Sequence, residues 1–191
     1  PSDYLAPADA DVFMKMAKAG APIKFVIAGQ MVCGYSYWTA DKTKVRSRKP
    51  FTSTPNIELG DNGLPKSVSR FWALPVYDCV TETVRVLEIT QKGLQEKIDA
   101  LISGNDYELS DLSKPVALKI SAKGAAKQTE YELLPMMFES EAMIPILQGS
   151  DLLVPGALDT LIFTAPAAPV TPKVPNLATP SVTTAAAQDV M

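Results

Sequence analysis

The sequence contains no histidine and only two cysteines among its 191 residues. Without histidine, a serine or cysteine nucleophile lacks its most common general base, and a zinc or blue-copper site lacks its most common nitrogen ligand. The chain also has neither a phosphate-binding P-loop motif nor the glycine fingerprint of dinucleotide-binding enzymes. We therefore expect a protein that is not an enzyme and that needs no metal ion or other cofactor.

Long apolar runs are absent as well. The stretch KFVIAGQMVCGY is far shorter than the roughly 20 apolar residues of a membrane-spanning helix, and the first residues, PSDYLAPADAD, lack the pattern of a secretory signal. Cys33 and Cys79 could pair, but two thiols in a chain of this size are more often buried apolar residues of a reducing cytoplasm. We expect a soluble cytoplasmic protein that does not contact a membrane.

The composition divides the chain into two parts. Hydrophobic residues make up 47% of the sequence, which is enough for one domain with a sizeable core. From residue 165 the sequence reads APAAPVTPKVPNLATPSVTTAAAQDVM, with much Pro, Ala and Thr and no aromatic residue. Such a segment cannot offset the entropy of ordering. We expect a domain over residues 1–164 and a flexible, disordered C-terminal tail over residues 165–191.

The formal net charge of -3 hides a strong asymmetry along the chain. Residues 12–75 carry ten Lys or Arg against three Asp or Glu, whereas residues 76–165 carry seven against fourteen. Electrostatic fields act over about 8 Å in physiological salt, so a basic segment can attract phosphates even in an acidic protein.

The basic residues concentrate in YSYWTADKTKVRSRKP, residues 35–50. Four cations occupy alternate positions, which is the period of a strand, and a fifth follows directly: Lys42, Lys44, Arg46, Arg48 and Lys49. Two interpretations remain open. The run is either a solvated edge strand, whose lysines prevent unwanted sheet pairing, or a surface that binds phosphates.

The remaining patterns predict a mainly β domain. PIKFVIAGQMVCGYSYW reads as one long strand, bent at Gly29 and Gly34, and a long mobile loop, PFTSTPNIELGDNGLPKS, follows the cationic run. SRFWALPVYDCV and TVRVLEIT read as strands, QKGLQEKIDALIS as a helix, and PVALKISAKG with KQTEYELLPM as a hairpin. An amphipathic segment, DADVFMKMAKAG, precedes these elements, and SEAMIPILQGSDLLVPGALDTLIF predicts short helices after them.

Five strands with a helix between strands 3 and 4 are the arrangement of an OB-fold β-barrel. Other small barrels and α+β sheets share this order. The expected fold class is therefore an OB-fold β-barrel with short peripheral helical additions at both ends.

One part of the chain carries a family resemblance. FVIAGQMVCGYSYW, the cationic strand, the Pro/Gly-rich loop, and RFWALPVYDCVTETVRVLEITQKGLQEKIDALI followed by a hairpin ending in TEYELLPM resemble the single-stranded DNA-binding proteins of tailed bacteriophages. The likeness covers roughly residues 13–135. It implies an OB barrel, single-stranded DNA as ligand, a role in replication or recombination, and no catalysis. It also implies replication or recombination proteins as partners of the tail, although Asp189 is the only acidic residue there.

Binding single strands without sequence preference requires cations along the backbone and aromatic faces on which bases stack. We expect Tyr35, Tyr37, Phe71 and Tyr77 to face outward as stacking platforms, whereas Trp72 is expected in the core and Trp38 can face either way. Tyr107 and Tyr131 stay unassigned. The predicted nucleic-acid-binding residues are Tyr35, Tyr37, Trp38, Lys42, Lys44, Arg46, Arg48, Lys49, Lys66, Arg70, Phe71 and Tyr77.

The alternative is a structural or interaction protein of a virion or assembly complex, in which the long loop and the tail contact other chains. It accounts for the tail equally well. It does not explain why alternating cations follow aromatic residues. The sequence leaves the oligomeric state open.

Overall fold

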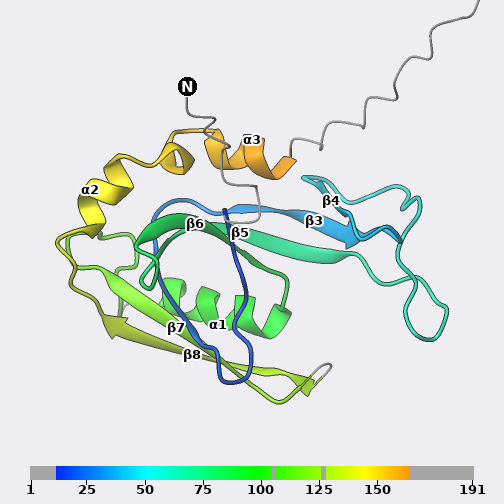
Figure 1. Ribbon diagram of the computed structural model, residues 1–191, viewed down its shortest axis with the longest axis horizontal. Helices are drawn as coiled ribbons and strands as arrows, with labels where there is room; N and C mark the ends of the chain where they lie inside the picture. The colour runs from blue at the N-terminus through cyan, green and yellow to red at the C-terminus, as the bar shows by residue number, and fades with distance from the viewer. Residues whose placement is uncertain (1–11, 105, 126–127, 164–191) are drawn as a thin grey trace, which may run out of the picture.

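The computed structural model describes residues 12–104, 106–125 and 128–163 (Figure 1). Within these ranges the strands are β1 (Phe13–Met14), β2 (Ile23–Ile27), β3 (Val32–Trp38), β4 (Lys44–Ser47), β5 (Ser69–Asp78), β6 (Thr83–Ile89), β7 (Val116–Lys123) and β8 (Glu130–Met137). The helices are α1 (Lys92–Ser103), α2 (Met143–Gln148), the 3-10 helix η3 (Asp151–Leu153) and α3 (Ala157–Phe163). The prediction of a mainly β fold with a helix before the last hairpin is confirmed.

The strands form one mixed, open sheet in the order β1-β6-β5-β2-β7-β8, and β3 pairs with both β5 and β4. Only the β1–β6 pair among these is parallel. In a closed barrel of this connectivity, β6 would pair with β8. In the described residues β6 pairs instead with β1, and β8 pairs only with β7, so the sheet stays open along this side.

The single long strand predicted before the cationic run is two strands, β2 and β3. Both pair with β5, but the four residues 28–31 between them face only two residues of β5. One of these is Pro75, which has no N–H to donate, although its carbonyl accepts a hydrogen bond from the Ala28 N–H at 2.9 Å. Gly29 fits closely here, since an added Cβ would lie 3.2 Å from the Pro75 ring. The ladder therefore breaks at Pro75.

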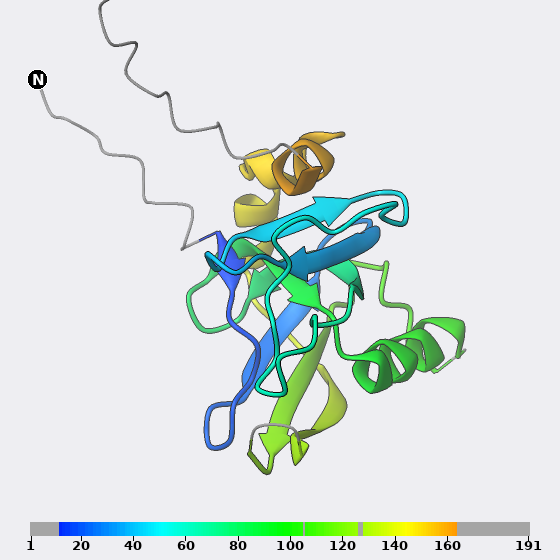
Figure 2. The same ribbon diagram turned by 90° about the vertical axis from the view of Figure 1, so that its right-hand side faces the viewer.

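Helices cover both faces of the sheet (Figures 1 and 2). On one face, α1 buries Leu94 and Ile98 against the main core. On the other face, α2 and α3 lie over the sheet, and they bury Met143 and Leu147, and Leu158 and Ile162, respectively. The C-terminal helices, confirmed as short, thus complete the core.

This second layer of helices overturns one prediction about β5. Phe71 and Tyr77 were expected to face outward, and both are completely buried. Phe71 packs with Leu158 and Ile162 of α3, and Tyr77 packs with residues of α2. Trp72, expected in the core with Leu74 and Val76, packs against the main core that contains them but is only half-buried.

The N-terminal end of the domain differs from the prediction, and the C-terminal tail lies outside the residues that the structure describes. The segment DADVFMKMAKAG was expected to form a helical addition. Its described part instead forms β1, which is followed by a tight turn in which Lys18 and Ala21 exchange backbone hydrogen bonds. Phe13 pairs alongside Val86 of β6. The expected flexible tail, residues 165–191, lies outside the described residues.

Candidate nucleic-acid interface

The side chains of β4 alternate between the two faces of the hairpin that β4 forms with β3. Lys44 lies opposite Trp38, and Arg46 lies opposite Ser36, so both cations share the face covered by α3. The hairpin is tightly closed, because a Cβ at Gly34 would lie 2.6 Å from the Ser47 carbonyl oxygen.

Carboxylates neutralise the cations of this face. The Arg46 guanidinium contacts Glu88 Oε2 through Nη2 at 2.8 Å and through Nε at 2.9 Å, and Lys44 forms an ion pair with the same carboxylate. Arg48 forms an ion pair with Asp159 of α3. The expected free row of cations is therefore a row of ion pairs.

Each of these cations also lies over an aromatic ring. Lys44 is 5.3 Å from the ring centroid of Trp38, Arg46 is 5.2 Å from that of Phe13, and Arg48 is 4.5 Å from that of Phe163. The side chains of Lys44 and Arg46 are only 17% and 20% exposed. Burial, with a contribution from the charge of Arg46, lowers the pKa of Lys44 to about 8, and burial also lowers the pKa of Arg46. This face is packed and leaves little room for a phosphate.

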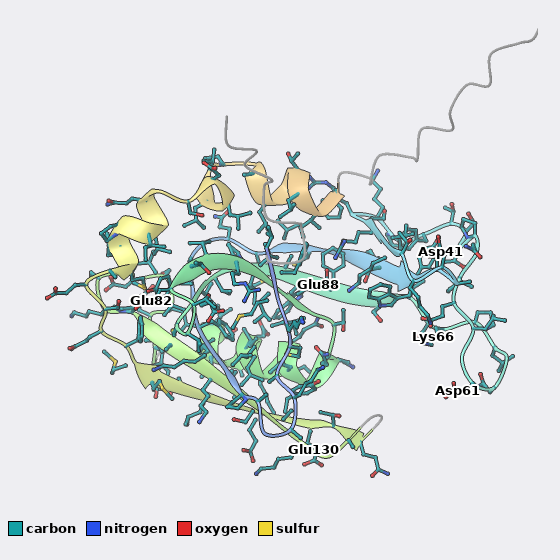
Figure 3. All side chains as sticks on the ribbon, in the orientation of Figure 1. Asp41, Asp61, Lys66, Glu82, Glu88 and Glu130 are labelled. Atoms are coloured by element: carbon teal, nitrogen blue, oxygen red, sulfur yellow. The ribbon has the colours of Figure 1, made fainter. Side chains whose placement is uncertain are left out.

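Lys42 lies in the turn between β3 and β4. Lys66 lies on the loop between β4 and β5 (Figure 3). Both form ion pairs with Glu58, Lys66 at 3.0 Å. The loop, expected to be mobile, folds back on the end of β3, where the Glu58 N–H donates to the Trp38 carbonyl at 2.7 Å. The two lysines thus stabilise the loop, although both stay exposed.

The opposite face of β3 and β5 presents a different set of side chains. The register places Tyr35 directly opposite Arg70, and Cys33 directly opposite Trp72, so all four share this face. The Arg70 guanidinium lies 6.0 Å from the ring centroid of Tyr35. In the described part of the chain, Arg70 and Lys49 are exposed and have no carboxylate partner.

A cleft of about 340 Å³ adjoins this face and is lined by Arg70, Trp72, Thr90, Lys92, Gln95, Glu96 and Asp99. It lies between β5 and the first two turns of α1. Gln95 Nε2 donates to the carbonyl oxygens of Ile89 at 2.8 Å and Arg70 at 3.4 Å, which fixes the amide against the sheet. Lys92 lies 3.7 Å from Glu96 one helical turn away. The cleft thus combines an indole ring with both cations and acceptors.

Of the predicted stacking residues, only Tyr35 lies on this face in a half-buried position. Tyr37 shares the face but is buried, because Phe51 packs edge-on against it at 5.0 Å and its hydroxyl donates to the Pro55 carbonyl at 3.2 Å. Trp38 is 45% exposed, but it lies on the other face. The expectation that Tyr37, Phe71 and Tyr77 are exposed stacking platforms is therefore wrong: Tyr37 points to this face but is covered, and Phe71 and Tyr77 lie on the other face.

Sequence reasoning named only Arg70 among the residues that line the cleft and missed the other six: Trp72, Thr90, Lys92, Gln95, Glu96 and Asp99. One signal was available. Trp72 follows Arg70 by two positions on the same strand, so the face that presents Arg70 must also present Trp72. The fold of α1 onto the end of β6, which brings Lys92 and Gln95 to the cleft, has no comparable signal in the sequence.

The two cysteines are unpaired, and Cys33 is exposed, contrary to the expectation of burial. Burial still raises the pKa of Cys33, an effect that the nearby Arg70 charge opposes. Cys79 is half-buried, and burial raises the pKa of its thiol to about 11. Cys33 therefore offers a chemical label on the face described above.

No family model, curated protein or solved structure matches the chain. Within the ranges that the structure describes, no helix has the length and apolar character needed to cross a membrane. The same residues include no group of three or more Cys, Asp or Glu side chains placed to hold a metal ion.

Proposed function

We propose that this chain binds single-stranded DNA, largely without sequence preference, and protects it during phage-type replication or recombination. The observation that carries the proposal is the group formed by the exposed Arg70 and the half-buried Tyr35 and Trp72 on one sheet face. A guanidinium and two aromatic rings side by side are the elements that non-specific single-strand binders use, and each base stack contributes about 1 to 3 kcal/mol.

The strand pairings support an OB-type arrangement as part of this proposal. Taken together, β2 and β3 correspond to the first strand of such a barrel, followed by β5, β6, α1, β7 and β8 in chain order. The first strand pairs with the second and the fourth, as β2 does with β5 and β7. OB-folds bind oligonucleotides on the face of strands two and three and on the loop after strand one, and Arg70 and Trp72 lie on the strand equivalent to the second.

The ion pairs of β4 lower the number of cations expected to contact phosphates. Arg70 and Lys92 line the cleft, and Lys49 is exposed without a carboxylate partner among the described residues, which corresponds to about three phosphate contacts. The slope of log affinity against log salt should then be near -2, so that affinity falls about 20-fold between roughly 50 and 200 mM salt.

The chain offers an internal test, since Trp38 and Trp72 are its only tryptophans and lie on opposite faces. Titration with a poly-thymidine oligonucleotide at low salt should quench tryptophan fluorescence in the Trp38→Phe variant. In the Trp72→Phe variant the DNA should still bind in a mobility-shift assay, but the quenching should be lost. Quenching that survives in Trp72→Phe and disappears in Trp38→Phe would move the interface to the other face. No binding by either assay would refute the proposal.

A structural or interaction protein is the second candidate. Exposed apolar side chains on the β4–β5 loop favour it, because Leu59, Leu64 and Val68 are 56%, 63% and 38% exposed. If the chain fails to bind DNA, loss of self-association or partner binding on Leu64→Ser would support this alternative.

A further inference from the structure

The groups that line the cleft beside Trp72 indicate which kind of base it would bind. This inference rests on the proposed binding of single-stranded DNA and makes it more specific. Its volume of about 340 Å³ lies near the lower end of the range for small-molecule sites. Trp72 supplies an aromatic face, and Arg70 and Lys92 lie at the rim of the same cleft on β5 and α1. These features suit one base, with its phosphates held by the cations.

Two hydrogen-bond acceptors of the cleft, Gln95 and Asp99, lie one helical turn apart on α1. Gln95 uses its Nε2 for two backbone carbonyls, so its Oε1 is left to accept. Asp99 is exposed and has no ion-pair partner among the described residues. The cations Arg70 and Lys92 also line the cleft, where they are placed to hold the phosphates on either side of the base.

Bases differ in what they offer to such acceptors. Cytosine, adenine and guanine carry an exocyclic amino group, and carboxylates accept from the amino group of cytosine in protein complexes. Thymine has only carbonyl oxygens and a ring N–H, and its O4 would face the carboxylate unfavourably. We infer that the cleft lined by Trp72, Gln95 and Asp99 is a base subsite that prefers amino-bearing bases, cytosine in particular, over thymine.

The test compares deoxycytidine and deoxythymidine oligonucleotides of equal length at one salt concentration. With the unchanged protein, the cytidine oligonucleotide should bind about fivefold more tightly, because a favourable base contact discriminates by at least about this factor. In Asp99→Asn the amide can also donate to thymine, so the ratio of the two affinities should fall to about one. The ratio is independent of the general gain in affinity expected when a negative charge is removed.

Glu130→Gln provides the matched control, because Glu130 is an exposed carboxylate on β8 (Figure 3). It should leave the ratio unchanged. Equal binding of both oligonucleotides by the unchanged protein, or a preference that Asp99→Asn does not alter, would overturn the base subsite and leave single-strand binding intact. Failure of both oligonucleotides to bind would instead count against the proposed function itself.

Discussion

The guanidinium of Arg46 on β4 contacts the carboxylate of Glu88 on β6 at 2.8 and 2.9 Å, although β3 and β5 lie between the two strands in the sheet. The side chain of Glu88 is only 9% exposed, and it also pairs with Lys44. One acidic residue therefore joins the cationic strand to a strand that is not its neighbour in the sheet.

Replacing Glu88 by Gln should destabilise the fold. The change leaves two poorly exposed cations, Lys44 and Arg46, without their counter-charge, and breaking a buried pair from one side costs about 3 kcal/mol. Urea unfolding should show a lower midpoint than for Glu82→Gln, a control in the exposed β5–β6 turn that should change stability by less than about 0.5 kcal/mol. Equal midpoints for the two variants would show that the Glu88 cluster contributes little.

Replacing Arg70 by Ala should weaken DNA binding about tenfold and make the salt slope less negative by about 0.7, since one phosphate contact and its stacking partner are lost. Arg48→Ala removes the same charge on the opposite face, where Arg48 pairs with Asp159. Its affinity and slope should stay close to those of the unchanged protein. Equal losses for the two variants would indicate that only the total charge matters.

Single-stranded DNA should protect Cys33 from alkylation. Cys33 lies opposite Trp72 on the proposed binding face and is exposed, whereas Cys79 is half-buried with a thiol pKa of about 11. Peptide mass spectrometry after brief maleimide treatment should show Cys33 modified first, and a saturating oligonucleotide should slow this modification selectively. Unaltered labelling of Cys33 under conditions of proven binding would place the DNA elsewhere.

Asp78 should make stability depend on acid pH. Burial raises the pKa of Asp78, but the N–H groups of Val80 and Thr81, the Thr81 side chain and the Arg85 guanidinium outweigh this effect and hold it below 3.8. The pKa of Asp78 is lower in the folded protein than in the unfolded chain. Its contribution to folding stability is therefore complete at pH values above the unfolded pKa, and it is lost as the pH falls from the unfolded pKa towards the folded pKa.

The matching variant is Asp78→Asn, which should cost about 2 kcal/mol near pH 7, since a buried charged hydrogen-bond acceptor is lost. Thermal melting from about pH 6 to about pH 2 should show a shallower loss of stability in the variant than in the unchanged protein. Parallel pH profiles would exclude Asp78 as a source of the acid sensitivity.

The local patterns of the sequence predicted the elements that depend on them. The spacing of Leu94, Ile98 and Leu101 identified α1, and the alternation in SRFWALPVYDCV and TVRVLEIT identified β5 and β6. The sequence of β5 could not show that the face of Phe71 is buried as well as the face of Leu74 and Val76, since large apolar residues occur on both faces. Helices α2 and α3, about 70 to 90 residues further along, decide that question by covering the face of Phe71.

The candidate site was predicted only in part for a similar reason. Tyr35 and Arg70 were named from sequence, and the register brings them together. The neutralisation of Lys44 and Arg46 depends on Glu88, a contact between residues 42 positions apart in the case of Arg46. The pattern of residues along either strand cannot predict the pairing of Lys44 and Arg46 with Glu88. This pairing depends on how the sheet bends, which brings β4 and β6 together.

The break at Pro75 has a consequence for tolerated changes in chain length. The four residues 28–31 face only two residues of β5, so the segment holds two more residues than its partner strand. Because this excess is even, the alternation of side chains is kept across the break, and Ile27 before it and Tyr35 after it lie on the same face of the sheet. A deletion of Gln30 alone would exchange the two faces of β3, turning Tyr35 towards α3 and Ser36 towards the cleft. Loss of both Gly29 and Gln30 would preserve the orientation of every side chain that follows. Length variation at this junction should therefore occur in pairs of residues.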